Sequence, residues 1–156
     1  MAAHDREIER KYLLRGMPAR VAEAASAEID QGYLPGTRIN ERIRRMRGDD
    51  GVRYYRTIKS GSGLERREVE EETTEEFFLA VWSLTRGARV HKRRYFVPVA
   101  DGVWELDEFL DRPDLALAEF EMEHVAQRVE LPDWLAPHVV REVTADQAYT
   151  NRALAK

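Results

Sequence analysis

Short stretches in which apolar and polar residues alternate recur along most of this chain. Successive side chains of a β-strand point to opposite faces, so such alternation predicts strands with one apolar and one polar face. We predict strands at residues 7–14, 28–34, 37–47, 52–60, 64–72, 88–99, 102–110 and 115–126. Turn-forming residues separate several of them, at positions 35–36, 48–51, 61–63 and 101–102, which favours short connections between strands.

Helical periodicity is clearest at residues 73–84. Phe77, Val81 and Leu84 recur there at helical spacing, and threonines at the start can cap the first turn. Shorter helices are predicted at residues 18–27, 131–139 and 144–154. We expect the face formed by Phe77, Val81 and Leu84, together with the C-terminal segments, to cover the apolar face of the sheet.

The charged residues of nearly every predicted strand fall on one face. Arg42 and Arg44, for example, share a face with Ile43 opposite, and the glutamates at positions 119 and 121 repeat this arrangement. A sheet with one face on the core and the other in water explains any single strand of this kind. Like charges on neighbouring positions of one face repel each other, however, and an ordinary surface gains nothing from this grouping. A site that binds phosphates and cations does gain from it.

Two geometries are compatible with these strands: an open sheet with its charged face in water, or a closed barrel with its charges inside. Seven or eight strands are about enough to close a small barrel, and closure removes the exposed edge strands. Water, metal ions and an anionic ligand must then fill the interior, because unpaired buried charges cost several kcal/mol each. The pattern alone therefore predicts an α+β, mainly β fold with flanking helices, formed by residues 1–156 as one domain, and leaves both geometries open.

Composition narrows the classes of function. Charged residues make up 35% of the 156 residues, yet the net charge is only −4. A nucleic-acid binder usually has a net basic surface, so we expect no nucleic-acid partner. The chain has no cysteine, which excludes disulfides, thiolate catalysis and cysteine-bound zinc. It also has no apolar run of about 18 residues and no signal-like N-terminus, so we expect a cytoplasmic protein without a membrane partner.

Charged motifs follow one another in order along nearly the whole chain. They are Glu7-Ile8-Glu9-Arg10-Lys11, Gln31-Gly32-Tyr33-Leu34, Arg42-Ile43-Arg44, Thr57-Ile58-Lys59, Arg66-Arg67-Glu68-Val69-Glu70, Lys92-Arg93-Arg94-Tyr95, Trp104-Glu105-Leu106-Asp107, Glu119-Phe120-Glu121, Thr144-Ala145-Asp146 and Tyr149-Thr150-Asn151. In this order they resemble the CYTH domains, also called triphosphate tunnel metalloenzymes. The resemblance implies the second geometry, a closed eight-stranded antiparallel β-barrel with flanking helices. In this tunnel basic residues would hold a triphosphate and acidic residues would hold Mg²⁺ or Mn²⁺.

The resemblance also implies roles for individual side chains. The phosphate-binding residues would be Lys11, Arg42, Arg44, Lys59, Arg66, Lys92 and Arg94. The metal ligands would be Glu7, Glu9, Glu119 and Glu121 first, and Glu68, Glu70, Glu105 and Asp107 next. Oxygen ligands without histidine or cysteine suit Mg²⁺ or Mn²⁺, although ion pairing with interior Arg and Lys residues is the alternative role of each carboxylate. Lys11 and Tyr33 are the candidate catalytic residues, which would position the attacking water or assist its deprotonation.

The family includes inorganic triphosphatases, thiamine triphosphatases and adenylate cyclases. We predict metal-dependent hydrolysis of a triphosphate, with inorganic tripolyphosphate as the first choice, because small stand-alone domains look most like inorganic triphosphatases. The alternatives are an adenylate cyclase that makes cyclic AMP and pyrophosphate from ATP, a thiamine triphosphatase, and a non-catalytic module that binds polyphosphate or nucleotide. The many carboxylates argue against the last, since anion binding alone does not need them. The expected partner is a small-molecule triphosphate, and the protein could form a homodimer.

Overall fold

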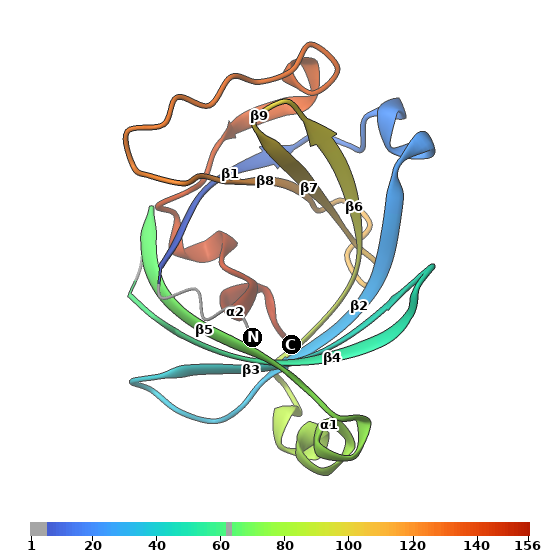
Figure 1. The fold of residues 1–156 in the computed structure, drawn as a ribbon, viewed down its shortest axis with the longest axis vertical. Coiled ribbons are helices and arrows are strands. Elements are labelled where there is room, and N and C mark those ends of the chain that lie inside the picture. The colour runs from blue at the N-terminus through green and yellow to red at the C-terminus, as the bar shows by residue number, and fades with distance from the viewer. Residues whose placement is uncertain (1–5, 62–63) are drawn as a thin grey trace.

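In the computed structural model, which describes residues 6–61 and 64–156, the strands form one antiparallel sheet that closes into a barrel (Figure 1). The strands are β1 (Glu7–Leu14), β2 (Ala25–Tyr33), β3 (Asn40–Gly48), β4 (Gly51–Ser60), β5 (Glu65–Thr73), β6 (Arg89–Val99), β7 (Gly102–Phe109), β8 (Ala116–Glu121) and β9 (Val139–Glu142). Their order is β5-β4-β3-β2-β6-β7-β8-β1-β9, and pairing of β1 with β5 closes a ring of eight. The predicted eight-stranded antiparallel barrel is therefore confirmed, with β9 as an additional strand.

Strand β1 is the seam of this barrel. Its first residues pair with β5, with Glu7 opposite Arg66, whereas its last residues pair with β9, with Tyr12 opposite Glu142. Residues from Glu9 onward also pair with β8. The charged N-terminal part of β1 therefore lies where the ring closes.

The helices are short: α1 (Glu75–Trp82), α2 (Asn151–Leu154) and the 3₁₀ helices η1 (Ala19–Glu23), η2 (Ser83–Thr85), η3 (Ala136–His138) and η4 (Gln147–Tyr149). Because α1 is the longest of them with 8 residues, no helix in the described ranges could cross a lipid bilayer.

Several predicted elements differ from the structure. The helix predicted at residues 18–27 is wrong, since only η1 forms before β2 begins. The helix predicted at residues 131–139 is also wrong, because a single turn, η3, leads directly into β9. The segment of β9 becomes a strand by pairing with β1, a tertiary contact that local propensity does not encode. The turn predicted at residues 61–63 falls partly on residues 62–63, which lie outside the described residues.

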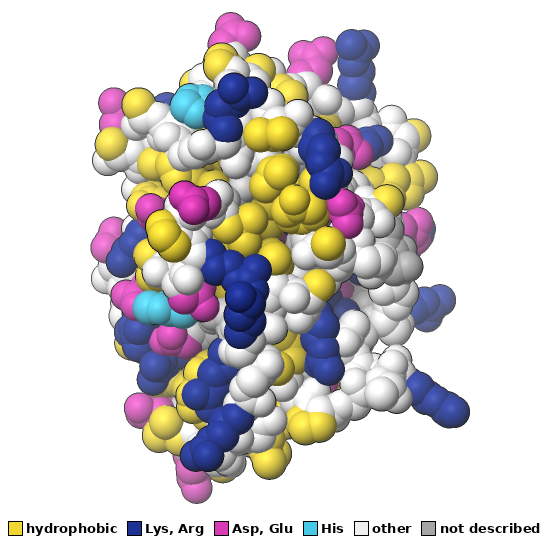
Figure 2. All heavy atoms as spheres, turned by 180° about the vertical axis from the view of Figure 1, so that it is seen from behind, with side chains coloured by type: hydrophobic (Ala, Val, Ile, Leu, Met, Phe, Trp, Pro, Cys, Tyr) yellow, Lys and Arg dark blue, Asp and Glu magenta, His cyan; other side chains and the backbone are white. Residues whose placement is uncertain are grey.

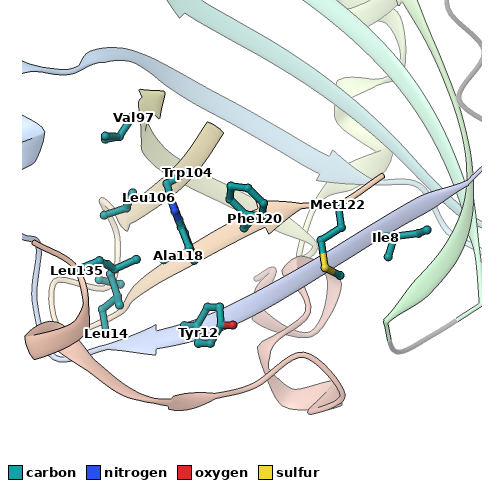
Figure 3. Packing of buried hydrophobic residues seen from close by; sticks show 11 residues of the cluster. Ile8, Tyr12, Leu14, Val97, Trp104, Leu106, Ala118, Phe120, Met122 and Leu135 are labelled. Atoms are coloured by element: carbon teal, nitrogen blue, oxygen red, sulfur yellow. The ribbon is translucent and has the colours of Figure 1, made fainter. Parts of the chain in front are cut away.

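The larger apolar cluster lies on the outer side of β1, β7 and β8 (Figure 3). The ring centroid of Trp104 lies 5.8 Å from that of Tyr12 and 5.0 Å from that of Phe120. Leu135, from the connection between β8 and β9, is fully buried against this cluster. Since the apolar faces of these strands point outward and are covered, their alternate, charged faces point into the barrel.

A second apolar cluster lies inside the barrel. Val90, Phe109 and Leu117 occupy the same strand faces as the charged residues two positions away, and they pack against Val143 and Leu154 from the C-terminal segment. Two backbone hydrogen bonds of 2.9 Å between Arg89 and Lys156 hold this segment against β6, and α2 appears within the ring of strands in Figure 1. Hydrophobic side chains also gather near the middle of the face seen from behind in Figure 2. The expectation that water, metal ions and an anionic ligand fill the interior is therefore corrected, since one part of it is filled by apolar side chains.

Helix α1 covers the outer side of β3 and β4 with a different residue from those predicted. Phe78 is 1% exposed, and its ring centroid lies 5.4 Å from that of Tyr54 and 4.8 Å from that of Trp82. Phe77 and Leu84, in contrast, are 37% and 54% exposed. The predicted contact face is therefore wrong for Phe77 and Leu84, whereas Val81 is half-buried. The docking angle of so short a helix is set by the sheet beneath it.

The buried position of Phe78 can be tested by unfolding in urea. We expect Phe78→Ala to lower the free energy of unfolding by about 3 kcal/mol or more, the usual cost of removing a buried phenylalanine. Phe77→Ala, the matched control on the next residue, should cost less than about 1 kcal/mol because its ring is partly in water. Equal losses for both variants would contradict the orientation of α1.

Candidate functional site

The charged part of the barrel interior encloses a cavity of about 280 Å³. It is lined by side chains from β1 to β8 and from the C-terminal segment. The residues of this pocket that the sequence analysis selected are Glu7, Glu9, Lys11, Tyr33, Arg42, Arg44, Lys59, Arg66, Glu68, Glu70, Arg94, Glu105, Glu119 and Glu121. All predicted site residues except Lys92 and Asp107 therefore line one pocket, with Glu121 at an exposed position.

Strand register places opposite charges side by side in this pocket. Lys11 lies opposite Glu119 on the neighbouring strand, and its Nζ is 3.2 Å from a carboxylate oxygen of Glu119. Lys59 Nζ lies 2.8 Å from Glu7 across the β1–β5 seam. Such cross-strand pairs compensate buried charge, which would otherwise be costly.

An acidic cluster lies at this seam around Arg66, which pairs with Glu9 and lies 3.3 Å from Glu7. Burial alone would raise the pKa of Glu7, but Lys59 and Arg66 outweigh it and lower this pKa to about 2. Burial, followed by repulsion from Glu119 and Glu7, raises the pKa of Glu9 to about 8.

Glu68 belongs to the same cluster. Burial raises its pKa to about 7, and the carboxylate of Glu7 adds to this rise while Lys59 opposes it. Glu9 and Glu68 are therefore carboxyl groups that would bind protons near neutral pH, and an incoming cation would stabilise their ionised forms.

Lys92 and Asp107 form an ion pair beneath the pocket. Both side chains are 0% exposed, with Lys92 Nζ 2.7 Å from Asp107 Oδ2. The same carboxylate accepts hydrogen bonds from Nε and Nη2 of Arg94 at 2.7 and 2.8 Å. The structure thus separates these two residues from the pocket lining: Asp107 orients Arg94, and Lys92 ties β6 to Asn151 of α2 through a 3.1 Å hydrogen bond.

Arg42 and Arg44 of β3 are both buried and point into the pocket. Arg42 donates to Thr57 Oγ1 at 3.1 Å and lies 3.6 Å from Glu70. Arg44 has an amide rather than a carboxylate as its partner, the side chain of Gln31. Burial, and then repulsion from Arg42 and Arg94, lowers the pKa of Arg44 to about 10.

Two buried guanidinium nitrogens of pocket side chains, Arg42 Nε and Arg66 Nε, have no hydrogen-bond partner among the described residues. Glu119 Oε1 accepts no hydrogen bond of good geometry, but it is ion-paired with Lys11 Nζ at 3.2 Å. Buried polar groups are nearly always hydrogen-bonded, so two orphaned donors in one cavity indicate a site for a ligand that accepts hydrogen bonds. The acidic and basic side chains that line the pocket are also nearly equal in number.

The ligand set suits a divalent metal in chemistry, since it consists of carboxylates, and in two of them, Glu9 and Glu68, burial raises the pKa so that a cation would favour the ionised form. Within the described ranges, however, no three acidic or histidine groups converge on a ready-made metal site. The carboxylates are held by Lys and Arg side chains instead, so a metal would have to displace some of these ion pairs.

Comparisons with known proteins agree with this geometry. No protein-family model matches the sequence. A curated inorganic triphosphatase from Nitrosomonas europaea is 38% identical over 155 residues, which cover 96% of each chain. This chain belongs to the inorganic triphosphatase family.

Solved structures extend the comparison. The crystal structure of an inorganic triphosphatase is 35% identical in sequence and superposes with a TM-score of 0.64. The match covers 96% of this chain and 93% of that one. A protein from Pyrococcus horikoshii OT3 shares the fold at 19% identity, with a TM-score of 0.56 over 84% of this chain and 82% of that one.

Several pocket residues of this triphosphatase-family chain were not selected from the sequence. The C-terminal segment contributes Thr144, whose Oγ1 accepts from the backbone N–H of Lys11 at 3.0 Å, and Tyr149, whose carbonyl accepts from Lys11 Nζ at 3.2 Å. Arg152 donates to the carbonyls of Leu34 and Gly36 and so ties the segment to the β2–β3 connection. The motifs at residues 144–146 and 149–151 were a signal for this segment, but nothing in them indicated that it folds into the barrel.

Because Asp107 is the buried counter-ion of two cations, its substitution should strongly destabilise the protein. Asp107→Asn leaves Lys92 and Arg94 without their buried counter-ion, and we expect it to lower the free energy of unfolding by about 3 kcal/mol or more. The control is Glu142→Gln, which removes an exposed pair with Arg10 at 3.2 Å and should cost less than about 1 kcal/mol. Urea unfolding at pH 7 measures both, and a small loss for Asp107→Asn would argue against this role.

Proposed function

We propose that this chain is a divalent-metal-dependent triphosphatase of the triphosphate tunnel (CYTH) type and that its substrate is inorganic tripolyphosphate. The observation that supports this most directly is the group of buried guanidinium groups of Arg42, Arg44 and Arg94 in one pocket that also contains many carboxylates. Guanidinium groups bind phosphate oxygens with two parallel hydrogen bonds, and carboxylates bind hard cations. The name of the 38% identical relative, inorganic triphosphatase, supports the same reaction.

The aromatic residues of the pocket favour an inorganic substrate. Among the described lining residues these are Tyr33 and Tyr149, and each ring already has a guanidinium group on one face. Arg152 lies 5.3 Å from the ring centroid of Tyr33, and Arg141 lies 5.3 Å from that of Tyr149. An adenine or thiamine ring therefore finds little free aromatic surface for stacking.

The charge balance of the pocket supports a requirement for metal. A triphosphate brings several negative charges into a cavity whose acidic and basic groups nearly cancel, so cations or protons must enter with it. Glu7, Glu9, Glu68 and Glu119 are the carboxylates that would hold Mg²⁺ or Mn²⁺, with Glu70, Glu105 and Glu121 nearby. When bound, such a cation neutralises charge on the phosphates and so favours attack by water.

Lys11 suits the role of a hydrogen-bond donor rather than a base. Burial opposes its charge, but Glu119 and Glu9 raise the pKa of Lys11 above its usual value, so its ammonium group stays protonated. Its Nζ is fixed between Glu119 and the carbonyl of Tyr149. Lys11 would thus orient a phosphate oxygen or the attacking water, while Arg42, Arg44 and Arg94 hold the phosphates.

Phosphate release from tripolyphosphate with Mg²⁺ or Mn²⁺ tests the proposal. We expect turnover that EDTA abolishes, and at least about a 100-fold lower kcat/KM for Arg42→Ala, the usual loss when one donor to a charged transition state is removed. Arg45→Ala, the matched control on the outward face of the same strand, should stay within about threefold of wild type, a difference below about 0.7 kcal/mol.

Parallel reactions with ATP and thiamine triphosphate separate the alternatives. Cyclic AMP and pyrophosphate as the products from ATP would identify a cyclase, and preference for thiamine triphosphate would identify the organic substrate. Tight binding of tripolyphosphate without any turnover would identify a non-catalytic module and overturn the proposed activity.

The raised pKa of Glu9 predicts how anion binding depends on pH. Below about pH 8 its carboxyl group is neutral, and above that pH it becomes a carboxylate that repels the triphosphate. Without metal, the Kd of wild type divided by that of Glu9→Gln should be constant near pH 6–7 and rise above pH 8, by up to about tenfold per pH unit. Calorimetry in EDTA measures both proteins, and the ratio cancels the titration of the ligand. A flat ratio between pH 6 and pH 9.5 would contradict this role of Glu9.

A further inference from the structure

Gln31 is a polar side chain buried behind the pocket. It is 0% exposed, lies on β2 directly opposite Arg44 of β3, and does not itself line the cavity. Its Oε1 accepts hydrogen bonds from both Nε and Nη2 of Arg44, at 3.0 and 2.8 Å. The amide thus holds one edge of the guanidinium group and leaves the other edge directed at the pocket.

The other pocket cations contributed by the strands are held by carboxylates, whereas Arg152 of the C-terminal segment is held by backbone carbonyls. Lys59 lies 2.8 Å from Glu7, and Arg94 lies 2.7 Å from Asp107. Within residues 6–61 and 64–156 no ion pair joins Arg44 to a carboxylate, and Glu70 acts on its charge only from a longer distance, by raising its pKa. Its immediate partner in the protein is a neutral amide, so much of its positive charge remains for a ligand.

We propose that Gln31 is a positioning residue that fixes the guanidinium group of Arg44 without neutralising it, so that the charge of Arg44 is kept for a phosphate group of the substrate. This inference rests on the proposed function, because it assumes that the ligand is a triphosphate. The buried amide would then influence substrate affinity although it does not line the pocket.

The chemistry of the position supports an amide over a carboxylate. A glutamate here could make the same two hydrogen bonds, but it would form a buried ion pair with Arg44 and compete with phosphate for its charge. An apolar residue would leave buried N–H donors of Arg44 unpaired and the guanidinium group free to turn away. Only a neutral acceptor both orients the group and preserves its charge.

The surroundings of Gln31 fix the amide in this orientation. Its Nε2 donates to the hydroxyl group of Tyr33 at 3.4 Å, which leaves Oε1 to face Arg44. The next residue, Gly32, packs so closely on η2 that a Cβ atom there would lie 2.5 Å from Cβ of Thr85. Strand β2 is therefore held tightly against η2 at the position where the amide must be placed. Burial and repulsion from Arg42 and Arg94 lower the pKa of Arg44 although Glu70 opposes this, which is consistent with a guanidinium group that no carboxylate contacts directly.

Two substitutions of Gln31 separate this role from a purely structural one. We expect Gln31→Glu to remain folded and to weaken tripolyphosphate binding at least tenfold, because the new carboxylate neutralises Arg44. Gln31→Leu removes the hydrogen bonds without adding charge, and its affinity should lie between those of wild type and Gln31→Glu. A structural role predicts the opposite order, since glutamate keeps the hydrogen bonds that leucine loses.

The matched control is Gln127→Glu, the same chemical change outside the pocket, where the side chain accepts from the backbone N–H of Glu123 at 2.9 Å. It should bind tripolyphosphate like wild type. Calorimetry in EDTA gives the affinities without turnover, and circular dichroism checks folding. Arg44→Ala sets the loss expected when the charge is absent, and Gln31→Glu should approach it.

The outcomes distinguish this inference from the proposed function. If wild type neither binds tripolyphosphate in EDTA nor hydrolyses it with Mg²⁺ or Mn²⁺, the proposed function fails and this inference fails with it. If wild type hydrolyses tripolyphosphate but does not bind it in EDTA, the KM of each variant with metal replaces its Kd, and the same order is expected. If wild type binds and folded Gln31→Glu binds equally well, or better than Gln31→Leu, the inference is overturned while the function stands. Should Gln31→Glu fail to fold, Gln31→Leu decides, and an affinity equal to that of wild type overturns the proposal.

Discussion

An ionised side chain inside a closed barrel must find its compensation within the barrel, because removal from water costs several kcal/mol that only partners can offset. The architecture of this protein follows from that constraint. Antiparallel register places Lys11 opposite Glu119 and Arg94 opposite Asp107, so neighbouring strands present opposite signs to each other. Closure of the ring and pairing of the charges therefore stabilise one another: an open sheet would leave the seam pairs around Glu7 unformed.

Depth within the barrel decides what a charge can do. Towards the cluster of Val90, Phe109 and Leu117 the interior is apolar, so Lys92 and Asp107 must satisfy each other and become a support for Arg94. In the cavity itself the pairing is incomplete, and Nε donors of Arg42 and Arg66 remain without hydrogen-bond partners among the described residues. Chemically similar residues thus divide into structural and ligand-binding groups according to where they lie relative to the cavity.

The near balance of acidic and basic groups explains why one pocket can serve an anion and cations together. A purely basic pocket would bind a triphosphate without need of metal, and a purely acidic one would repel it. Here each ion pair can open when the ligand supplies the opposite charge to both partners, so little electrostatic energy is lost on exchange. Gln31 marks one position where the protein holds a cation with a neutral group instead.

The sequence alone determined which residues share a strand face, because the alternation of side chains is a local property of extended backbone. Strand β1 has the bounds predicted for it, the hairpin turn at residues 48–51 joins β3 and β4, and almost every charged doublet points inward. Other features depended on contacts between distant segments. The pairing of β9 with β1, the choice of Phe78 over Phe77, the entry of the C-terminal segment and the depth of Lys92 are all of this kind. Alternation tells which side of a strand a residue faces, whereas its depth in the barrel depends on how neighbouring strands are staggered and on what fills the end, and only the tertiary structure decides these.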